Sequence, residues 1–128
     1  MVKRSLEFYS LGPLEKEVME IVWKRNGGSS VRDILDEINS RKSVPYAYTT
    51  ILTICQNLEK KGVLRSERRG KKNLYFPTVT REQFYRDRLV HFIGNFVREN
   101  PDVAASFFAE TMDLSPEEAY ELLKKFEK

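Results

Sequence analysis

The apolar residues of the first 45 positions recur at the three- and four-residue spacing of amphipathic helices. A first helix is predicted to open at Pro13, whose missing N–H is harmless in a first helical turn, and to end at the Asn-Gly-Gly of residues 26–28. A short strand over residues 29–31 and a second helix over residues 31–39, capped by Ser30 with Asp33, are expected next. The apolar positions of the two helices are Leu14, Val18, Ile21, Val22, Val31, Ile34, Leu35 and Ile38, and Trp23 is predicted to join the core.

A third helix, over residues 47–61, is predicted to have two different faces. Pro45 disfavours helix before it, so the helix is expected to start at Tyr46 or Ala47. Gly62 is expected to end it in a left-handed cap. The inward face is predicted to consist of Ala47, Ile51, Ile54, Cys55 and Leu58, which makes Cys55 a small buried hydrophobe. The outward face carries mostly hydroxyl and amide side chains and has no carboxylate before Glu59. Its residues are Tyr46, Thr49, Thr53, Gln56, Asn57 and Lys60, flanked by Thr50 and Leu52.

Residues 64–69 and 73–79 read as two strands around a turn at residues 70–72. Together they predict a β-hairpin, the wing, with four basic residues at or near its tip: Arg68, Arg69, Lys71 and Lys72. Such a basic wing can bind a phosphate backbone. The alternative is that its charges protect an edge strand from aggregation.

The C-terminal part predicts three helices. Thr80 caps a long one, Asn100-Pro101 breaks it, a short helix covers residues 102–110, and Ser115 with Pro116 starts the last. Their apolar faces are rich in aromatic rings, which either cap their own core or are buried in a two-fold dimer, the expectation favoured here. The rings assigned to dimerisation are Phe84, Phe92, Phe96, Phe107, Phe108 and Phe126.

The composition limits which kinds of site the protein is expected to contain. The 128 residues are 41% hydrophobic and 12% aromatic, as expected of a folded protein. Cys55 is the only cysteine and His91 the only histidine, so no disulfide, zinc cluster or cofactor is expected, and no segment reads as a signal peptide or membrane span. The sequence contains no catalytic triad, phosphate loop or paired carboxylates, so we expect that the protein is not an enzyme. We also expect it to be intracellular and cytoplasmic.

The net charge of +3 is divided unevenly: residues 1–86 carry +7 and residues 87–128 carry −4. Residues 41–72 hold nine basic side chains against two acidic ones, which is typical of a surface that meets a polyanion. A lysine-rich solvated surface is the alternative. Short polar side chains on a helix suit base edges in a major groove. The fold class predicted is mainly α with a small β-hairpin wing, with a winged helix-turn-helix DNA-binding domain over residues 1–79 and a helical dimerisation domain over residues 80–128.

These motifs resemble the penicillinase-repressor family of winged-helix repressors, the BlaI/MecI/CopY type. The resemblance lies in LGPLEKEVMEIVW with its terminal Trp23, in SSVRDILDEI, in TTILTICQNLEKKGVL and in the strand KNLYFPTV. It implies a homodimeric repressor that binds an inverted-repeat operator in double-stranded DNA, without metal. By position, the stretch that touches bases in relatives corresponds to Thr49, Thr50, Leu52, Thr53 and Asn57. Independently of the resemblance, Tyr46 is expected to join these recognition-helix residues, and Arg41 and Lys42 are expected to be flanking phosphate contacts.

The sequence departs from the family pattern in two places, and these limit what the resemblance implies about how the repressor is inactivated. Members involved in β-lactam resistance are inactivated by cleavage of an Asn-Phe bond, and the comparable position here is Phe107-Phe108, without the asparagine. The copper-responsive members carry a C-terminal cysteine cluster, which this sequence lacks. The alternative function is a winged-helix interaction module that docks a protein partner through its aromatic C-terminal helices.

Overall fold

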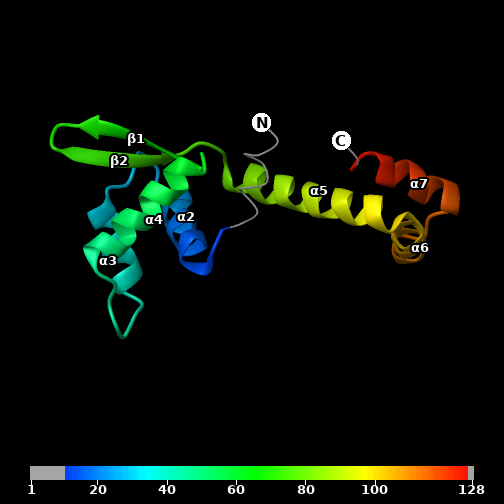
Figure 1. The fold of residues 1–128 in the computed structure, drawn as a ribbon, viewed down its shortest axis with the longest axis horizontal. Helices are drawn as coiled ribbons and strands as arrows, with labels where there is room; N and C mark the ends of the chain where they lie inside the picture. The colour runs from blue at the N-terminus through cyan, green and yellow to red at the C-terminus, as the bar shows by residue number, and fades with distance from the viewer. Residues whose placement is uncertain (1–10, 127–128) are drawn as a thin grey trace. The chain divides into compact units, whose positions relative to one another are not determined.

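The computed structural model describes residues 11–126, whose helices and strands are labelled in Figure 1. In chain order they are α2 (Pro13–Lys24), α3 (Val31–Asn39), α4 (Tyr48–Lys60), β1 (Leu64–Arg69), β2 (Lys72–Pro77), α5 (Arg81–Glu99), α6 (Pro101–Thr111) and α7 (Pro116–Lys124). The chain divides between Phe84 and Tyr85 into two compact units, so the first turn of α5 belongs to the first unit.

Helices α2, α3 and α4 of the first unit form a three-helix core. Its centre consists of side chains that the sequence pattern assigned to inward faces: Val18, Ile21, Val22, Ile34, Leu35, Ile38, Ile51, Cys55 and Leu58, joined by Met19. Local signals set the helix ends. The Glu15 carboxylate accepts the Gly12 N–H at 2.8 Å ahead of Pro13, and Ser30 and Asp33 satisfy each other's backbone N–H groups at 3.0 Å.

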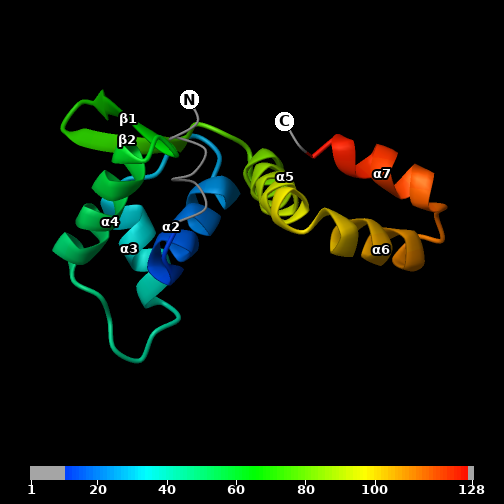
Figure 2. The ribbon, with the colours of Figure 1, turned by 45° about the vertical axis from the view of Figure 1, so that its right-hand side comes forward.

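Strands β1 and β2 form the predicted hairpin, which lies alongside the helices in both views (Figures 1 and 2). They pair antiparallel from Leu64↔Pro77 to Arg69↔Lys72, so the turn is the two residues Gly70 and Lys71, one shorter than expected. The short strand expected over residues 29–31 is reduced to a single bridge between Ser29 and Tyr75. That bridge ties the start of α3 to β2.

Helix α4 ends as the glycine signal predicted. Gly62 has φ +83°, a conformation that favours glycine, and Val63 behind it is fully buried. The Thr78 hydroxyl donates toward the carbonyl oxygens of Gly62 at 2.6 Å and Val63 at 3.0 Å. The base of the hairpin is thereby fixed to the end of α4.

Trp23 and Phe84 pack against each other in the first unit. The Trp23 indole N–H donates to the Val79 carbonyl at 2.9 Å, and its ring lies 5.3 Å from that of Phe84. Phe84 is only 1% exposed. The expectation that Phe84 serves dimerisation is therefore wrong: Phe84 belongs to the first unit, where Trp23 is the apolar partner that the sequence pattern did not reveal.

The second unit contains the remainder of α5 with α6 and α7. Its core consists of Val97, Ala104, Ala105 and Leu123, with Ile93, Phe108 and Phe126 packed against it. Gly94 allows the Phe126 carbonyl to approach the helix, because any Cβ there would overlap that oxygen. Ser115 caps α7 as predicted, accepting the Glu118 N–H at 3.1 Å. Among the described residues, none of the helices has the length and apolar character needed to cross a membrane.

Candidate nucleic-acid interface

Helix α4 separates its polar and apolar side chains almost as predicted. Ile51, Cys55 and Leu58 are fully buried against the other helices, and Ile54 is half-buried. Ala47 is an exposed N-cap, because the helix starts one residue later than expected. On the opposite side Thr49, Thr50, Thr53 and Gln56 are exposed, with no carboxylate among them.

The six side chains assigned to the recognition helix do not all share this exposed face. Leu52 and Asn57 are half-buried on its two flanks. Asn57 lines a hollow shared with Gly12 and Pro13 at the start of α2. Tyr46 lies before the helix, where its backbone N–H and carbonyl bond the Asn39 side chain at 2.8 and 3.1 Å. Tyr46 thus fastens the α3–α4 loop, and the three threonines form the open surface.

The predicted flanking cations, Arg41 and Lys42, have acidic partners. Arg41 pairs with Glu37 at 2.9 Å, and Lys42 with Glu17 at 3.2 Å, both at exposed positions. Exposed pairs of this kind contribute about 0–1 kcal/mol, so a phosphate can replace the carboxylate with little loss.

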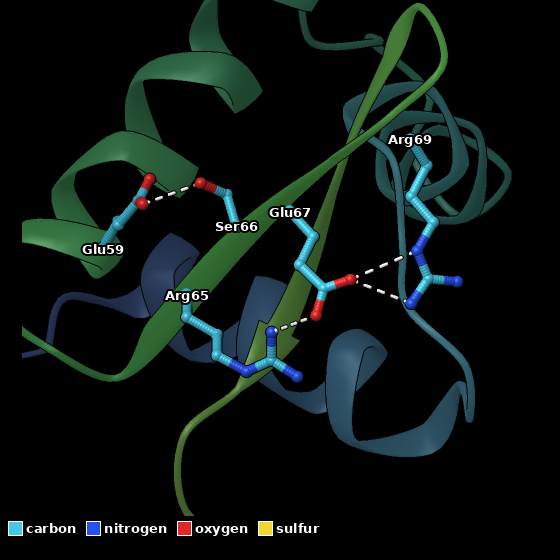
Figure 3. A network of polar contacts seen from close by, with 5 residues as sticks. All are labelled: Glu59, Arg65, Ser66, Glu67 and Arg69. Carbon is cyan, nitrogen blue, oxygen red and sulfur yellow. Dashed lines mark hydrogen bonds and ion pairs between the residues drawn. The ribbon is translucent and has the colours of Figure 1, made fainter.

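The two faces of the hairpin differ in how their charged side chains are paired. On one face Arg65 and Arg69 flank Glu67, which accepts from Arg65 at 2.6 Å and from two nitrogens of Arg69 at 2.8 and 3.1 Å (Figure 3). These hydrogen bonds, the one from Arg65 foremost, lower the pKa of the Glu67 carboxyl. Arg65 also lies over the Phe76 ring at 4.5 Å. The charge of Arg69, one of the four predicted wing cations, is therefore already shared within this face.

The other hairpin face points toward α4, as the Ser66 hydroxyl shows by donating to Glu59 at 2.8 Å (Figure 3). Arg68 lies on this face, because side chains alternate along a strand. In the described part of the chain, Arg68, Lys71 and Lys72 form no ion pair. The pKa of the Asp33 carboxyl is nevertheless lowered, mainly by the Ser30 N–H and to a smaller extent by the attraction of Lys72, so Arg68 and Lys71 are the exposed wing cations in this part of the chain without a carboxylate partner.

Beside Arg68 is a hollow of about 310 Å³, the wing hollow, between the start of α3, α4 and the hairpin. Its lining includes Arg32, Tyr48, Arg68, Lys71, Lys72 and Tyr75. No pattern in the sequence marks Arg32, Tyr48 or Tyr75 as functional residues. Arg32 and Tyr48 stand on different helices, and only folding brings the guanidinium over the ring at 5.3 Å.

Cys55 behaves as a buried hydrophobe. It is fully inaccessible, and burial, with a smaller contribution from Glu59, raises the pKa of its thiol to about 12. A thiol held in its protonated form is neither a nucleophile nor a ready metal ligand.

The second unit, considered by itself, exposes an apolar surface. Phe92 is 70% and Phe107 58% exposed. They border a hollow of about 360 Å³ whose lining is entirely apolar: Leu89, Phe92, Ile93, Phe96, Val103, Phe107 and Phe108. Of the rings assigned to dimerisation, Phe92, Phe96, Phe107 and Phe108 lie on this surface, while Phe126 is half-buried against the core of the unit.

Comparison with known proteins gives concordant matches. The profile of a family described as "Penicillinase repressor" matches residues 11–128. The transcriptional regulator BlaI of Mycobacterium tuberculosis is 31% identical over 80 residues, 62% of this chain and 56% of that protein, so the match spans just over half of the mycobacterial relative. The penicillinase repressor of Bacillus licheniformis is 26% identical over 113 residues, 88% of this chain and 86% of its own length.

Among solved structures, the solution structure of the DNA binding domain of the repressor BlaI aligns with a TM-score of 0.50 at 25% identity. The alignment covers 56% of this chain and 84% of that one. The predicted fold class is confirmed: a mainly helical chain that contains a winged helix-turn-helix.

Proposed function

The chain belongs to the penicillinase repressor family, and on that premise we propose that it is a transcriptional repressor that binds an inverted-repeat operator as a homodimer. One observation carries the proposal: α4 exposes Thr49, Thr50 and Thr53 without any carboxylate, beside a hairpin with unpaired positive charge. Its relatives are named as repressors and transcriptional regulators. This proposal makes the chain a DNA-binding protein of the cytoplasm rather than an enzyme.

In this proposal α4 enters the major groove and reads bases. Threonine offers a hydroxyl that donates or accepts and a methyl group that fits against thymine. The absence of carboxylates from the exposed face keeps phosphate repulsion low. Glu59, the first acidic residue of α4, accepts a hydrogen bond from Ser66 and lies on the side that faces the hairpin.

The second unit supplies dimerisation. Its exposed apolar surface would be covered by the same surface of a second copy, which is the usual geometry of a two-fold dimer. The functional division expected between residues 79 and 80 is retained, except that the first turn of α5 stays with the DNA-binding side because Phe84 packs there. Two DNA-binding units related by a dyad match an inverted repeat with half-sites about one helical turn apart.

The experiment is selection of duplexes from a random pool by the full chain, followed by footprinting of the recovered sequence. An inverted repeat with protection on both half-sites is expected. Thr49→Ala and Thr53→Ala should then relax the base preference at defined positions, at about 1–3 kcal/mol per lost base contact. Recovery of no common sequence, or protection without dyad symmetry, would contradict the proposal.

Dimerisation is tested separately by sedimentation equilibrium of Phe92→Ala. Burying a phenylalanine stabilises by about 1.5–3 kcal/mol. Because Phe92 is 70% exposed in one chain, two symmetric copies should together lose about 2–4 kcal/mol, a roughly 30- to 1,000-fold weaker dimer. Val44→Ala is the control, since Val44 is 79% exposed in the first unit, outside this surface. Equal effects of both substitutions would reject the assigned surface.

The exposed apolar surface also favours a second candidate, an interaction module that docks a different protein. That candidate expects a stable monomer that ignores duplex DNA even at low salt. A dimer that selects an inverted repeat excludes it.

A further inference from the structure

A hollow of about 670 Å³, the α2 hollow, lies in the first unit beside the C-terminal end of α2. Its other walls are Arg41, at the start of the α3–α4 loop, and residues 77–83, which run from the end of β2 into α5. Small-molecule sites in proteins usually measure about 300–1,000 Å³, so the hollow has the size of a ligand site. Apart from Arg41, none of its lining residues is assigned to DNA binding or dimerisation.

The charged side chains of the α2 hollow favour an anion. Its lining contains three cations and one carboxylate, that of Glu20, which Arg81 engages at 2.8 and 3.2 Å. Arg41 pairs with Glu37, which lies outside the lining. In the described part of the chain, the Lys24 ammonium makes no ion pair or hydrogen bond. Lys24 is therefore the lining cation that is available to a bound carboxylate.

The remaining lining favours an aromatic body. Trp23 lines the hollow, and its indole N–H is already bonded to the Val79 carbonyl at 2.9 Å, so the ring offers apolar contact rather than another hydrogen bond. Pro77 and Val79 extend this apolar wall. Aromatic rings pack favourably in offset or edge-to-face arrangements. The exposed side-chain amide of Asn26, which makes no hydrogen bond to a described residue, can donate to a carboxylate.

The wall formed by residues 77–81 connects the hollow to the wing and to α4. Thr78 lines the hollow, and its N–H donates to the Val63 carbonyl at 2.9 Å while its hydroxyl donates toward the carbonyls of Gly62 and Val63. These contacts fix the end of β2 to the end of α4. A molecule packed between Trp23 and this wall would press on the segment that sets the position of the wing relative to α4.

We propose that the α2 hollow binds a small aromatic carboxylate, and that this binding lowers the affinity for the operator. Lys24 and Asn26 hold the carboxylate, and Trp23 contacts the ring. The effect on the operator rests on the proposed function and deepens it, because it supplies a release signal. The binding site itself does not depend on that function.

Binding is tested with indole-3-acetate as the probe and indole-3-acetamide as its uncharged analogue. The full chain, labelled with nitrogen-15, has one tryptophan and therefore one indole N–H resonance, which reports on the hollow alone. Indole-3-acetate should shift this resonance in a saturable way, and indole-3-acetamide should bind about fivefold more weakly. An unchanged resonance at millimolar probe, or equal binding of both compounds, would overturn the site.

Lys24 and Arg25 provide a matched pair of variants. They are consecutive and both exposed, but Arg25 lies outside the lining and pairs with Asp33 at 3.3 Å. Lys24→Ala should weaken indole-3-acetate about fivefold and remove the preference over the amide, whereas Arg25→Ala should stay within about twofold. Equal losses in the two variants would mean that net charge, rather than a group in the hollow, attracts the probe.

The regulatory part is tested by the affinity of the full chain for the selected operator, with indole-3-acetate or with the same concentration of sodium acetate. The probe should weaken operator binding at least about fivefold, and by reciprocity the operator should weaken the probe by the same factor. Lys24→Ala alone should bind the operator within about twofold of wild type and lose the response at that probe concentration. Unchanged operator affinity with a saturated hollow would overturn the regulatory role.

The outcomes separate this inference from the function on which its regulatory part rests. A chain that selects no inverted repeat contradicts the proposed repressor function, yet the titrations of wild type, Lys24→Ala and Arg25→Ala still decide whether the hollow is a site. A chain that binds its operator but leaves the Trp23 resonance unmoved by the probe contradicts the hollow alone.

Discussion

Phe84→Leu tests where the first aromatic ring of α5 belongs. Phe84 is 1% exposed, and its ring lies 5.3 Å from that of Trp23. Complete truncation of a buried phenylalanine to alanine destabilises by about 3–5 kcal/mol. A domain the size of the first unit has about 4–11 kcal/mol in total, so alanine would leave little of it folded. Leucine keeps most of the apolar volume.

The loss for leucine can be estimated from the ring carbons it lacks. At about 0.8 kcal/mol per buried carbon group, together with the lost ring–ring contact, the substitution should destabilise the first unit by about 1–3 kcal/mol. For a domain of this size each kcal/mol lowers the melting temperature by about 4–8 °C, so a decrease of about 5–20 °C is expected.

Trp23 makes the measurement specific to the first unit. It is the only tryptophan of the chain and contacts Phe84 directly, so its fluorescence in a urea titration reports this unit alone. Phe92→Leu, at an exposed position of the second unit, is the control and should shift the Trp23 transition by no more than about 0.5 kcal/mol. An unchanged Trp23 transition combined with a dissociated dimer in Phe84→Leu would refute the packing argument and restore the dimerisation role predicted from the sequence.

Three other predictions concern the first unit. Gly28→Ala should destabilise more than Gly27→Ala: both glycines have positive φ, but a Cβ at Gly28 would lie 2.7 Å from the Phe76 ring while one at Gly27 meets nothing within 4 Å, so melting curves should place Gly27→Ala at about 1–2 kcal/mol and Gly28→Ala beyond it. Cys55, with its thiol pKa raised to about 12 by burial, should resist iodoacetamide at pH 8 in the folded protein and react in urea, since only the thiolate is alkylated; rapid labelling without denaturant would contradict its burial. Ser30→Ala should cost about 1 kcal/mol through loss of the α3 cap, and a thermal melt equal to that of the wild type would show that the cap contributes nothing.

Signals that act within a few residues could be interpreted from the sequence. Ser30 with Asp33, Gly62 and Asn100-Pro101 each act through backbone geometry at their own position, and the structure confirms their effects. The buried face of α4 also followed from spacing alone, because a helix fixes which residues share a side. Ala47 was misassigned because the helix starts one residue later than the proline rule suggested.

Tertiary contacts decided the rest, because periodicity identifies an apolar face but not what covers it. Phe84 and Phe92 look alike in the sequence, yet only Phe84 meets Trp23, across a loop closure that no local pattern encodes. Asn57 is not on the exposed face of α4 as predicted, because the start of α2 lies beside it, and Leu52, predicted on the flank, is half-buried where the hairpin lies beside α4.

The basic wing shows the same division. Its charge, its hairpin and its position after a carboxylate-free helix were determined by the sequence. Which arginine has a partner was decided by strand alternation and register, which turn Arg69 toward Glu67 and Arg68 toward α4. The bridge between Ser29 and Tyr75 then brings Arg32 to the same hollow. A property that depends on the residue type at one position can be predicted from the sequence. A site that needs several side chains at one point forms only when the chain folds, so it cannot be predicted in the same way.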